Sequence, residues 1–184
     1  MTALTPVLTD AWRLRDYWLR AFVRTIRGMA IGALVTPILY VVAMGVMLGG
    51  FIAADPAALE GAGSYLSFVA PGLVASQAMT TVFGEATYPV IGMIIWDKTY
   101  YSMIATPVGP GAVVLAHLAA ILARVGLGSA AFLLVLAPFG AFESWWAVLA
   151  LPVSLLVGLA FAAPIYAFSA GTRNDNSFNL LFRL

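Results

Sequence analysis

The chain has 184 residues, of which 62% are apolar and only 9% are charged, and this balance excludes an ordinary soluble domain. Its net charge of +1 is uninformative by itself, and the absence of cysteine excludes disulfides, thiolate metal sites and cysteine nucleophiles. Runs of about 20 apolar residues with almost no charge instead predict transmembrane helices. We therefore predict an all-α membrane protein that forms a single transmembrane domain over residues 1–184.

The first predicted element is a basic amphipathic helix over residues 10–27, with Asp10 as its N-cap. At about 100° per residue, four of its arginines fall within one narrow stripe, and bulky apolar side chains fill the remaining arc. Such a helix lies in the membrane surface with its arginines toward the lipid phosphates. A helix docked on a protein core is the alternative. The stripe consists of Arg13, Arg20, Arg24 and Arg27, and Arg15 is the exception.

Four transmembrane helices are predicted next, over residues 28–52, 65–88, 111–136 and 145–169. The end of the second is ambiguous, because Pro89 either kinks a continuing helix or begins a separate interfacial one. Trp145 and Trp146 are expected to form an interfacial belt at the start of the fourth.

The last part of the chain, over residues 170–184, is expected to be a cytoplasmic loop followed by the start of a fifth span. Its final apolar run, over residues 178–184, has only seven residues. A run of that length is too short to cross a hydrocarbon core of about 30 Å. We therefore expect the chain to be a truncated form of a longer membrane protein.

The distribution of charge predicts the orientation. Five arginines precede the first span, Lys98 lies between the second and third, and Arg173 and Arg183 follow the fourth. The loops on the opposite side hold only acids. Because cytoplasmic loops carry the excess of lysine and arginine, we expect a multi-pass protein with a cytoplasmic N-terminus.

Glu85 and Arg124 are the two charged residues that reach membrane depth in this arrangement. Arg124 lies 13 residues into the third predicted span. If the second span continues to about residue 95, Glu85 lies at a similar depth and pairs with Arg124, which lowers the cost of burying either charge. If that span ends at Glu85, the acid lies at the interface and the pair does not form. Gln77 and Thr81 precede Glu85 at steps of four, so the three share a helix face and are expected to line or gate a path.

The sequence contains no enzyme or nucleotide-site motif. The GxxxxGK[ST], GxGxxG and HExxH patterns are all missing. His117 has no acid or cysteine near it in the sequence, so we expect a packed histidine rather than a metal ligand, with a proton relay as the alternative. The energy for any transport must then come from a partner or an ion gradient.

The segment over residues 89–106 is the best candidate for contact with a cytosolic partner, and an ordinary interfacial loop is the alternative. Its apolar residues are expected to lie in the membrane interface, and these are Val90, Ile91, Ile94 and Ile95. Its polar residues are expected to face the cytosol, and these are Asp97, Lys98, Thr99 and Ser102.

Three blocks in this region resemble the membrane subunit of type-2 ABC exporters, the ABC-2 permease family. They are YLSFVAPGLVASQAM, EATY and DKTYYSMIATPV, and they lie in that order from residue 65. They are most similar to the branch of nodulation lipooligosaccharide exporters and daunorubicin-resistance permeases. The likeness covers residues 65–107 well and extends more loosely through Arg124 to the region of Phe178 and Asn179.

The resemblance implies a six-helix fold that is cut short here at the start of the fifth helix, with residues 10–27 as the cytoplasmic elbow helix. It implies that residues 89–106 form a coupling helix for a separate cytosolic ATPase subunit, which binds ATP and Mg²⁺, whereas this chain binds no cofactor. A second permease copy would complete a homodimer or a heterodimer. The positions expected to couple to the ATPase are Asp97, Lys98, Tyr100, Tyr101, Thr106 and Pro107.

We therefore predict a permease subunit, not an enzyme, that exports a lipophilic drug, lipid or glycolipid across a bacterial plasma membrane and binds no nucleic acid. One alternative is a small four-helix secondary transporter that works as a dimer and couples to protons through Glu85. Another is a membrane scaffold that transports nothing. An ATPase partner would favour the first reading, and activity without an ATPase would favour the second.

Overall fold

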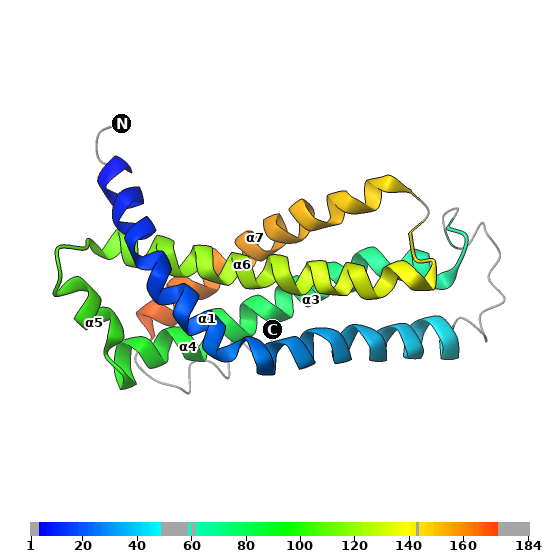
Figure 1. Ribbon diagram of the computed structural model, residues 1–184, viewed down its shortest axis with the longest axis horizontal. Coiled ribbons are helices and arrows are strands. Elements are labelled where there is room, and N and C mark those ends of the chain that lie inside the picture. Colours follow the sequence, from blue (N-terminus) through cyan, green and yellow to red (C-terminus); the bar gives the residue numbers. More distant parts are fainter. Residues whose placement is uncertain (1–3, 49–58, 60–61, 143, 173–184) are drawn as a thin grey trace.

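The computed structural model describes residues 4–48, 59, 62–142 and 144–172, and this part of the chain is helical with no strands. Three long helices lie side by side along the molecule (Figure 1). They are α3 (Tyr65–Ala86), α6 (Pro110–Leu136) and α7 (Ala150–Gly171). The end of the first predicted span at residues 49–52, the loop acids Asp55, Glu60 and Glu143, and residues 173–184 lie outside the described residues.

Three stretches of the described chain are long and apolar enough to cross a membrane. They are Tyr65–Trp96, Pro110–Phe139 and Trp145–Gly171, and they correspond to the second, third and fourth predicted spans. The all-α class with long apolar helices is therefore confirmed. The first predicted span, over residues 28–52, does not appear as a fourth such stretch, because its described part holds only the shorter apolar helix Leu34–Met44.

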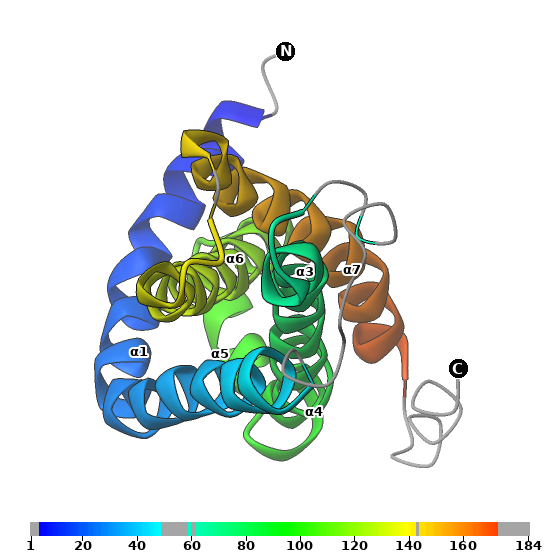
Figure 2. The ribbon, with the colours of Figure 1, turned by 90° about the vertical axis from the view of Figure 1, so that its right-hand side faces the viewer.

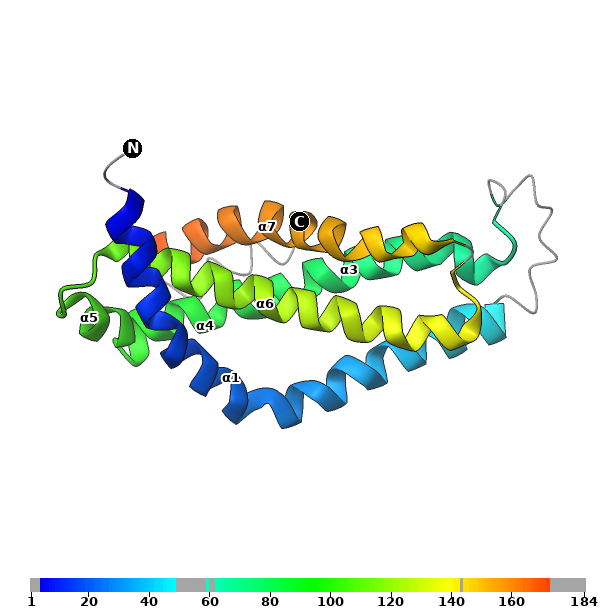
Figure 3. The ribbon, with the colours of Figure 1, turned by 45° about the horizontal axis from the view of Figure 1, so that its top comes forward.

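The N-terminal region differs from the prediction of a separate helix that ends at residue 27. Helix α1 (Leu4–Tyr40) runs through that point without a break and continues into the π-helical η1 (Val41–Leu48). In place of the predicted boundary between two helices, α1 has a sharp bend (Figure 3). Thr25 Oγ1 donates to the carbonyls of Ala21 and Phe22, at 3.2 and 3.1 Å, and such back-bonding tends to bend helices.

Small residues recur on the buried faces of α3 and α7. Along α3 the buried positions recur every four residues, namely Leu66, Ala70, Val74, Ala78, Val82 and Ala86. Helix α7 buries Ser154, Gly158 and Ala162, which are also four residues apart. Because lipid is as apolar as leucine, close packing of small residues rather than burial of large ones holds membrane helices together. This explains why α3, α6 and α7 form a compact group, with α1 along one side (Figure 2).

The continuation of α3 beyond Ala86 is the main correction to the predicted boundaries. The helix is interrupted at Thr87, whose Oγ1 donates to the carbonyl of Phe83 at 2.6 Å, and then resumes as α4 (Tyr88–Ile91) and η2 (Gly92–Trp96). Val90 and Ile91 are fully buried, so the prediction that they lie in the membrane interface is wrong. They pack in the protein core instead, against the end of α7.

A second break separates this continuation from the short helix α5 (Thr99–Ile104). Lys98 lies at this break with φ +53°, in the left-handed region that a residue with a Cβ seldom adopts. The single helix predicted over residues 89–106 is therefore wrong. Its first part extends the transmembrane helix, and only its second part forms a separate surface element.

The contact between α6 and α7 leads to a prediction about stability. A Cβ on Gly158 would lie 3.1 Å from Val125 Cγ1 and 3.5 Å from Leu122 Cδ2. Val125 is 1% exposed and β-branched, so it has little freedom to move away. We expect Gly158→Ala to lower the free energy of unfolding in detergent micelles by about 1–3 kcal/mol.

The matched control is Gly84→Ala, because nothing lies within 4 Å of a Cβ at Gly84 in α3. In that variant the higher helix propensity of alanine should leave stability unchanged or raise it by about 1 kcal/mol. If Gly158→Ala proved as stable as Gly84→Ala, the close contact of α6 with α7 would be contradicted.

Candidate functional site

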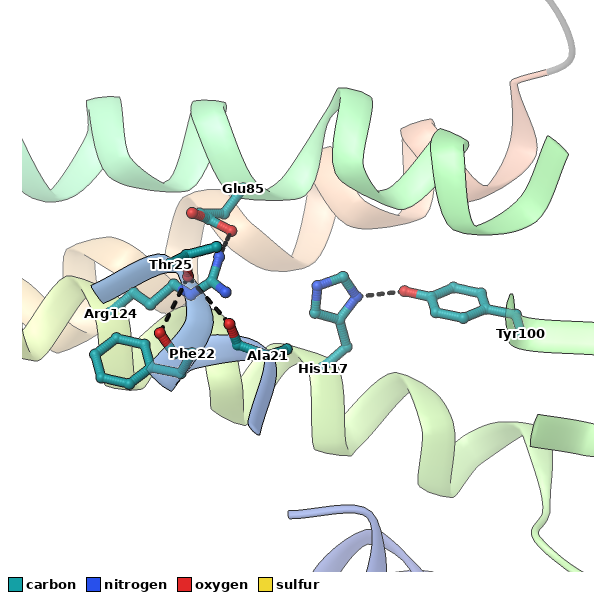
Figure 4. Close-up of polar contacts among 7 residues, drawn as sticks. All are labelled: Ala21, Phe22, Thr25, Glu85, Tyr100, His117 and Arg124. Carbon is teal, nitrogen blue, oxygen red and sulfur yellow. Dashed lines mark hydrogen bonds and ion pairs between the residues drawn. The ribbon is translucent and has the colours of Figure 1, made fainter. Parts of the chain in front are cut away.

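An ion pair joins two of the membrane-spanning helices. Arg124 of α6 donates from Nη1 to Glu85 Oε2 of α3 (Figure 4). The side chains are 15% and 19% exposed respectively. Glu85 lies well inside the apolar stretch Tyr65–Trp96, so the alternative in which the span ends at Glu85 does not hold. Each charge provides the partner that the other needs in a poorly solvated place.

The rest of the polar stripe lies on the same face of α3. Thr81 Oγ1 donates to the carbonyl of Gln77 at 2.9 Å, and Gln77 Nε2 lies 3.5 Å from Thr81 Oγ1. A Cβ on Gly128 of α6 would lie 3.9 Å from Thr81 Oγ1. Thr81 thus lies opposite Gly128, and Glu85 lies opposite Arg124. Each pair is four residues from the other, so the two helices run in opposite directions along this interface. The stripe follows the interface between α3 and α6.

A second polar group lies closer to the end of the bundle that carries α5 and is named here the Tyr–His cluster. It consists of Tyr100, His117, Tyr166 and Trp18. The Tyr100 hydroxyl hydrogen-bonds to His117 Nδ1 (Figure 4) and lies 2.6 Å from the hydroxyl of Tyr166. The Trp18 ring stacks on the His117 ring with centroids 4.0 Å apart and planes at 16°. The cluster thus joins α5, α6, α7 and α1 in one place.

The Tyr–His cluster is a chain of hydrogen bonds around the Tyr100 hydroxyl. Burial raises the pKa of the Tyr100 hydroxyl above its ordinary value, so the phenol keeps its proton. A phenol has one proton to give, so Tyr100 donates in at most one of its two bonds. His117 is 2% exposed and is packed, as the sequence predicts. Within the described chain, no group of histidine and acidic residues could hold a metal ion.

The predicted coupling residues do not all lie on the surface. Tyr100 points into the bundle, whereas the other five positions are exposed, and these are Asp97, Lys98, Tyr101, Thr106 and Pro107. Lys98 and Tyr101 line a hollow of about 730 Å³, together with Ile94, Ile95 and the end of α7 from Ala170 to Thr172. The surface of α5 is therefore continuous with the C-terminal end of α7.

The arginines of the predicted stripe whose side chains the structure describes lie on the surface. Arg13 pairs with Asp10 at 3.2 Å, and Arg20 and Arg24 are exposed. The backbone of Arg27 belongs to α1, and its side chain lies outside the described part of the structure. Sequence reasoning did not identify Trp18 or Tyr166 as part of a site. The aromatic residues of the cluster come from distant helices, and no spacing in the chain relates them.

Comparison with known proteins gives one consistent result. The chain is similar to proteins named Nodulation protein J. It is 33% identical over 155 residues to the one from Rhizobium leguminosarum bv. trifolii, which covers 83% of this chain and 55% of the relative. The one from Rhizobium meliloti is 30% identical over 158 residues, covering 84% and 58%. The one from Bradyrhizobium diazoefficiens is 31% identical over 156 residues, covering 84% and 56%.

The chain spans about half the length of these curated relatives. No family model matches it, and no solved structure does. The matched length of 155 residues or more is nevertheless much greater than the blocks at residues 65–107 that carry the resemblance to ABC-2 permeases. The likeness therefore extends well beyond the second predicted span and the segment that follows it.

Proposed function

We propose that the chain is the permease subunit of a type-2 ABC exporter, driven by ATP hydrolysis in a separate subunit. The observation that carries this proposal is the similarity to Nodulation protein J over more than four fifths of the chain. It agrees with the family resemblance of the sequence blocks between residues 65 and 107. The apolar helices support placement in the bacterial plasma membrane, and the distribution of arginine supports a cytoplasmic N-terminus.

The cargo in this proposal is a lipophilic drug, lipid or glycolipid. The name of the relatives favours a nodulation signal among these, and the resemblance to nodulation lipooligosaccharide exporters favours that class of signal. The polar stripe of Gln77, Thr81 and Glu85 would then border the path, because it is the main polar feature on the buried side of α3. A second copy of the permease would supply the other wall.

The ATPase would contact the exposed surface of α5 and the hollow beside it. Lys98 supports this site, since its left-handed backbone costs about 1–2 kcal/mol and glycine would relieve that cost. Strained residues of this kind are concentrated at binding sites and switches. When the ATPase subunits close, α5 would move, and Tyr100 would carry the movement to α6 and α7 through the Tyr–His cluster.

Replacing Lys98 tests this contact without disturbing the fold. We expect Lys98→Gly to be at least as stable as the unaltered chain, because glycine accepts the left-handed conformation. We also expect it to lose at least about tenfold in affinity for the ATPase, the loss of one strong charge-assisted contact of about 1.4 kcal/mol or more. The measurement is co-purification, from membranes of the native cells, of a P-loop ATPase with the tagged chain.

Lys98→Arg is the matched control, since it keeps the positive charge at the same position and should retain most of the partner. Undiminished capture of the ATPase by Lys98→Gly would contradict the proposed contact. If the unaltered chain captured no ATPase and still transported, the exporter proposal would give way to the proton-coupled transporter.

A further inference from the structure

A groove of about 570 Å³ lies between the first part of α1 and the N-terminal half of α6. Its volume is within the range of about 300–1,000 Å³ that is usual for sites that bind small molecules. The α1 wall carries the large side chains of Trp12, Trp18 and Phe22. The α6 wall carries alanines, among them Ala120 and Ala123, which leave the space between the two helices unfilled.

The position of the groove follows from the path of α1. The N-terminal part of α1 crosses α6 before the helix bends away (Figures 1 and 3). Trp18 is the buried member of the α1 wall at 6% exposure, and its stack on His117 ties α1 to α6 at the edge of the groove. The indole N–H of Trp18 is buried, and none of the described residues accepts its hydrogen bond.

The charges at the groove are positive. Two arginines line it, Arg15 and Arg124, and no acid does. Arg124 is already engaged by Glu85. Arg15 stands at the rim with its side chain 50% exposed, stacks on the Trp12 ring at 4.4 Å, and donates from Nε to Asp16 at 3.2 Å.

Arg15 is therefore suited to an anionic ligand. An exposed ion pair such as the one with Asp16 is weak. A guanidinium has five N–H donors and binds phosphate oxygens in pairs, so Arg15 retains donors for a phosphate. Apolar walls below a basic rim are complementary to an anionic amphiphile and not to a soluble anion or to a neutral hydrocarbon.

We infer that this groove binds one anionic phospholipid of the bilayer, with an acyl chain between α1 and α6 and its phosphate on Arg15. The predicted orientation puts the basic part of α1 at the cytoplasmic surface, where the headgroups of that leaflet lie. The lipid is a resident of the protein and not its cargo. It would fill the space left by the alanines of α6 and hold α1 against the bundle, whatever the protein transports.

Trp18 provides the readout for a direct test. In a variant with Trp12, Trp96, Trp145 and Trp146 replaced by phenylalanine, Trp18 is the single tryptophan, and its burial shields it from the surrounding micelle. The purified chain in detergent is titrated with phosphatidylglycerol that is brominated in its acyl chains. We expect saturable quenching of Trp18 at about one lipid per chain, and at least tenfold weaker binding of brominated phosphatidylcholine.

Two substitutions in that background separate the groove from the general lipid surface. Ala120→Leu fills the groove and should weaken the quenching at least tenfold. Arg15→Gln should remove the preference for phosphatidylglycerol and leave the fold intact, because its side chain is half exposed. Arg13→Gln is the matched control, since Arg13 pairs with Asp10 outside the groove and should change nothing.

Quenching that does not saturate, or that is equal for the two lipids in the parent variant, would overturn the inference. So would an Arg15→Gln variant that keeps the full preference for phosphatidylglycerol. If Ala120→Leu did not fold, the comparison of Arg15→Gln with Arg13→Gln would still decide whether Arg15 binds the headgroup.

Discussion

Replacing Arg124 with methionine should lower the free energy of unfolding by about 3 kcal/mol, the lower end of the range for breaking a buried ion pair. The lower end applies because both side chains keep some exposure, 15% for Arg124 and 19% for Glu85. The loss arises from the Glu85 carboxylate, which is left in an apolar setting without its partner. The measurement is reversible unfolding in mixed detergent micelles, followed by circular dichroism.

The double variant Glu85→Leu, Arg124→Met should recover most of that loss, because it removes both charges together. Arg24→Met is the surface control, and its effect should be within about 0.5 kcal/mol. A stability of Arg124→Met equal to that of Arg24→Met would show that the pair is not formed in the membrane-embedded protein.

The same pair separates the two transport hypotheses. In the exporter, Glu85→Gln should leave capture of the ATPase unchanged, because Glu85 lies in the span and not on the surface of α5. In the proton-coupled alternative, transport would proceed without an ATPase and would stop in Glu85→Gln. Transport by the purified chain alone, abolished in that variant, would therefore contradict the exporter proposal.

Replacing Tyr100 with phenylalanine should uncouple α5 from the bundle with little change in shape. The variant loses the hydroxyl that contacts both His117 and Tyr166, so we expect unfolding to become easier by about 1–2 kcal/mol. If the cluster transmits movement of α5, export should fall roughly 5- to 150-fold, the range of typical coupling free energies. The ATPase should still co-purify, because Tyr100 points away from the surface.

Tyr101→Phe is the control for this experiment. Tyr101 is the next residue in α5 and is 56% exposed, so the loss of its hydroxyl should change neither stability nor export. The measurements are unfolding in micelles and transport into vesicles that contain the permease with its ATPase. Equal export by the two variants would mean that the Tyr–His cluster has only a packing role.

Much of the helical layout could be predicted, because a helix long and apolar enough to cross a membrane is visible as a continuous apolar run within one segment of the sequence. Residues 111–136 and 145–169 were expected to span, and the apolar stretches Pro110–Phe139 and Trp145–Gly171 occupy those places. The boundary after α3 could not be predicted, because Pro89 permits either a kink or a fresh start. Tertiary contacts favour the continuing helix, because Val90 and Ile91 are buried in the protein core. The apolar stretch therefore extends to Trp96.

Part of the candidate site could likewise be predicted from the sequence, and part could not. The stripe of Gln77, Thr81 and Glu85 could be read from steps of four within one helix. Its pairing with Arg124 depended on the relative depth of two helices, which local sequence left open. The Tyr–His cluster was not predictable, because Trp18, Tyr100 and Tyr166 are far apart in the chain and no spacing relates them.

By itself, then, the sequence determined the class of the protein, the apolar stretches that cross the membrane and the shared face of the polar stripe. These are properties of hydrophobicity and helical period within one segment. Only the tertiary structure decided that Glu85 meets Arg124, that Tyr100 turns inward and that α1 leaves a groove on α6. Those outcomes depend on how closely small residues let neighbouring helices approach, and no single helix contains that information.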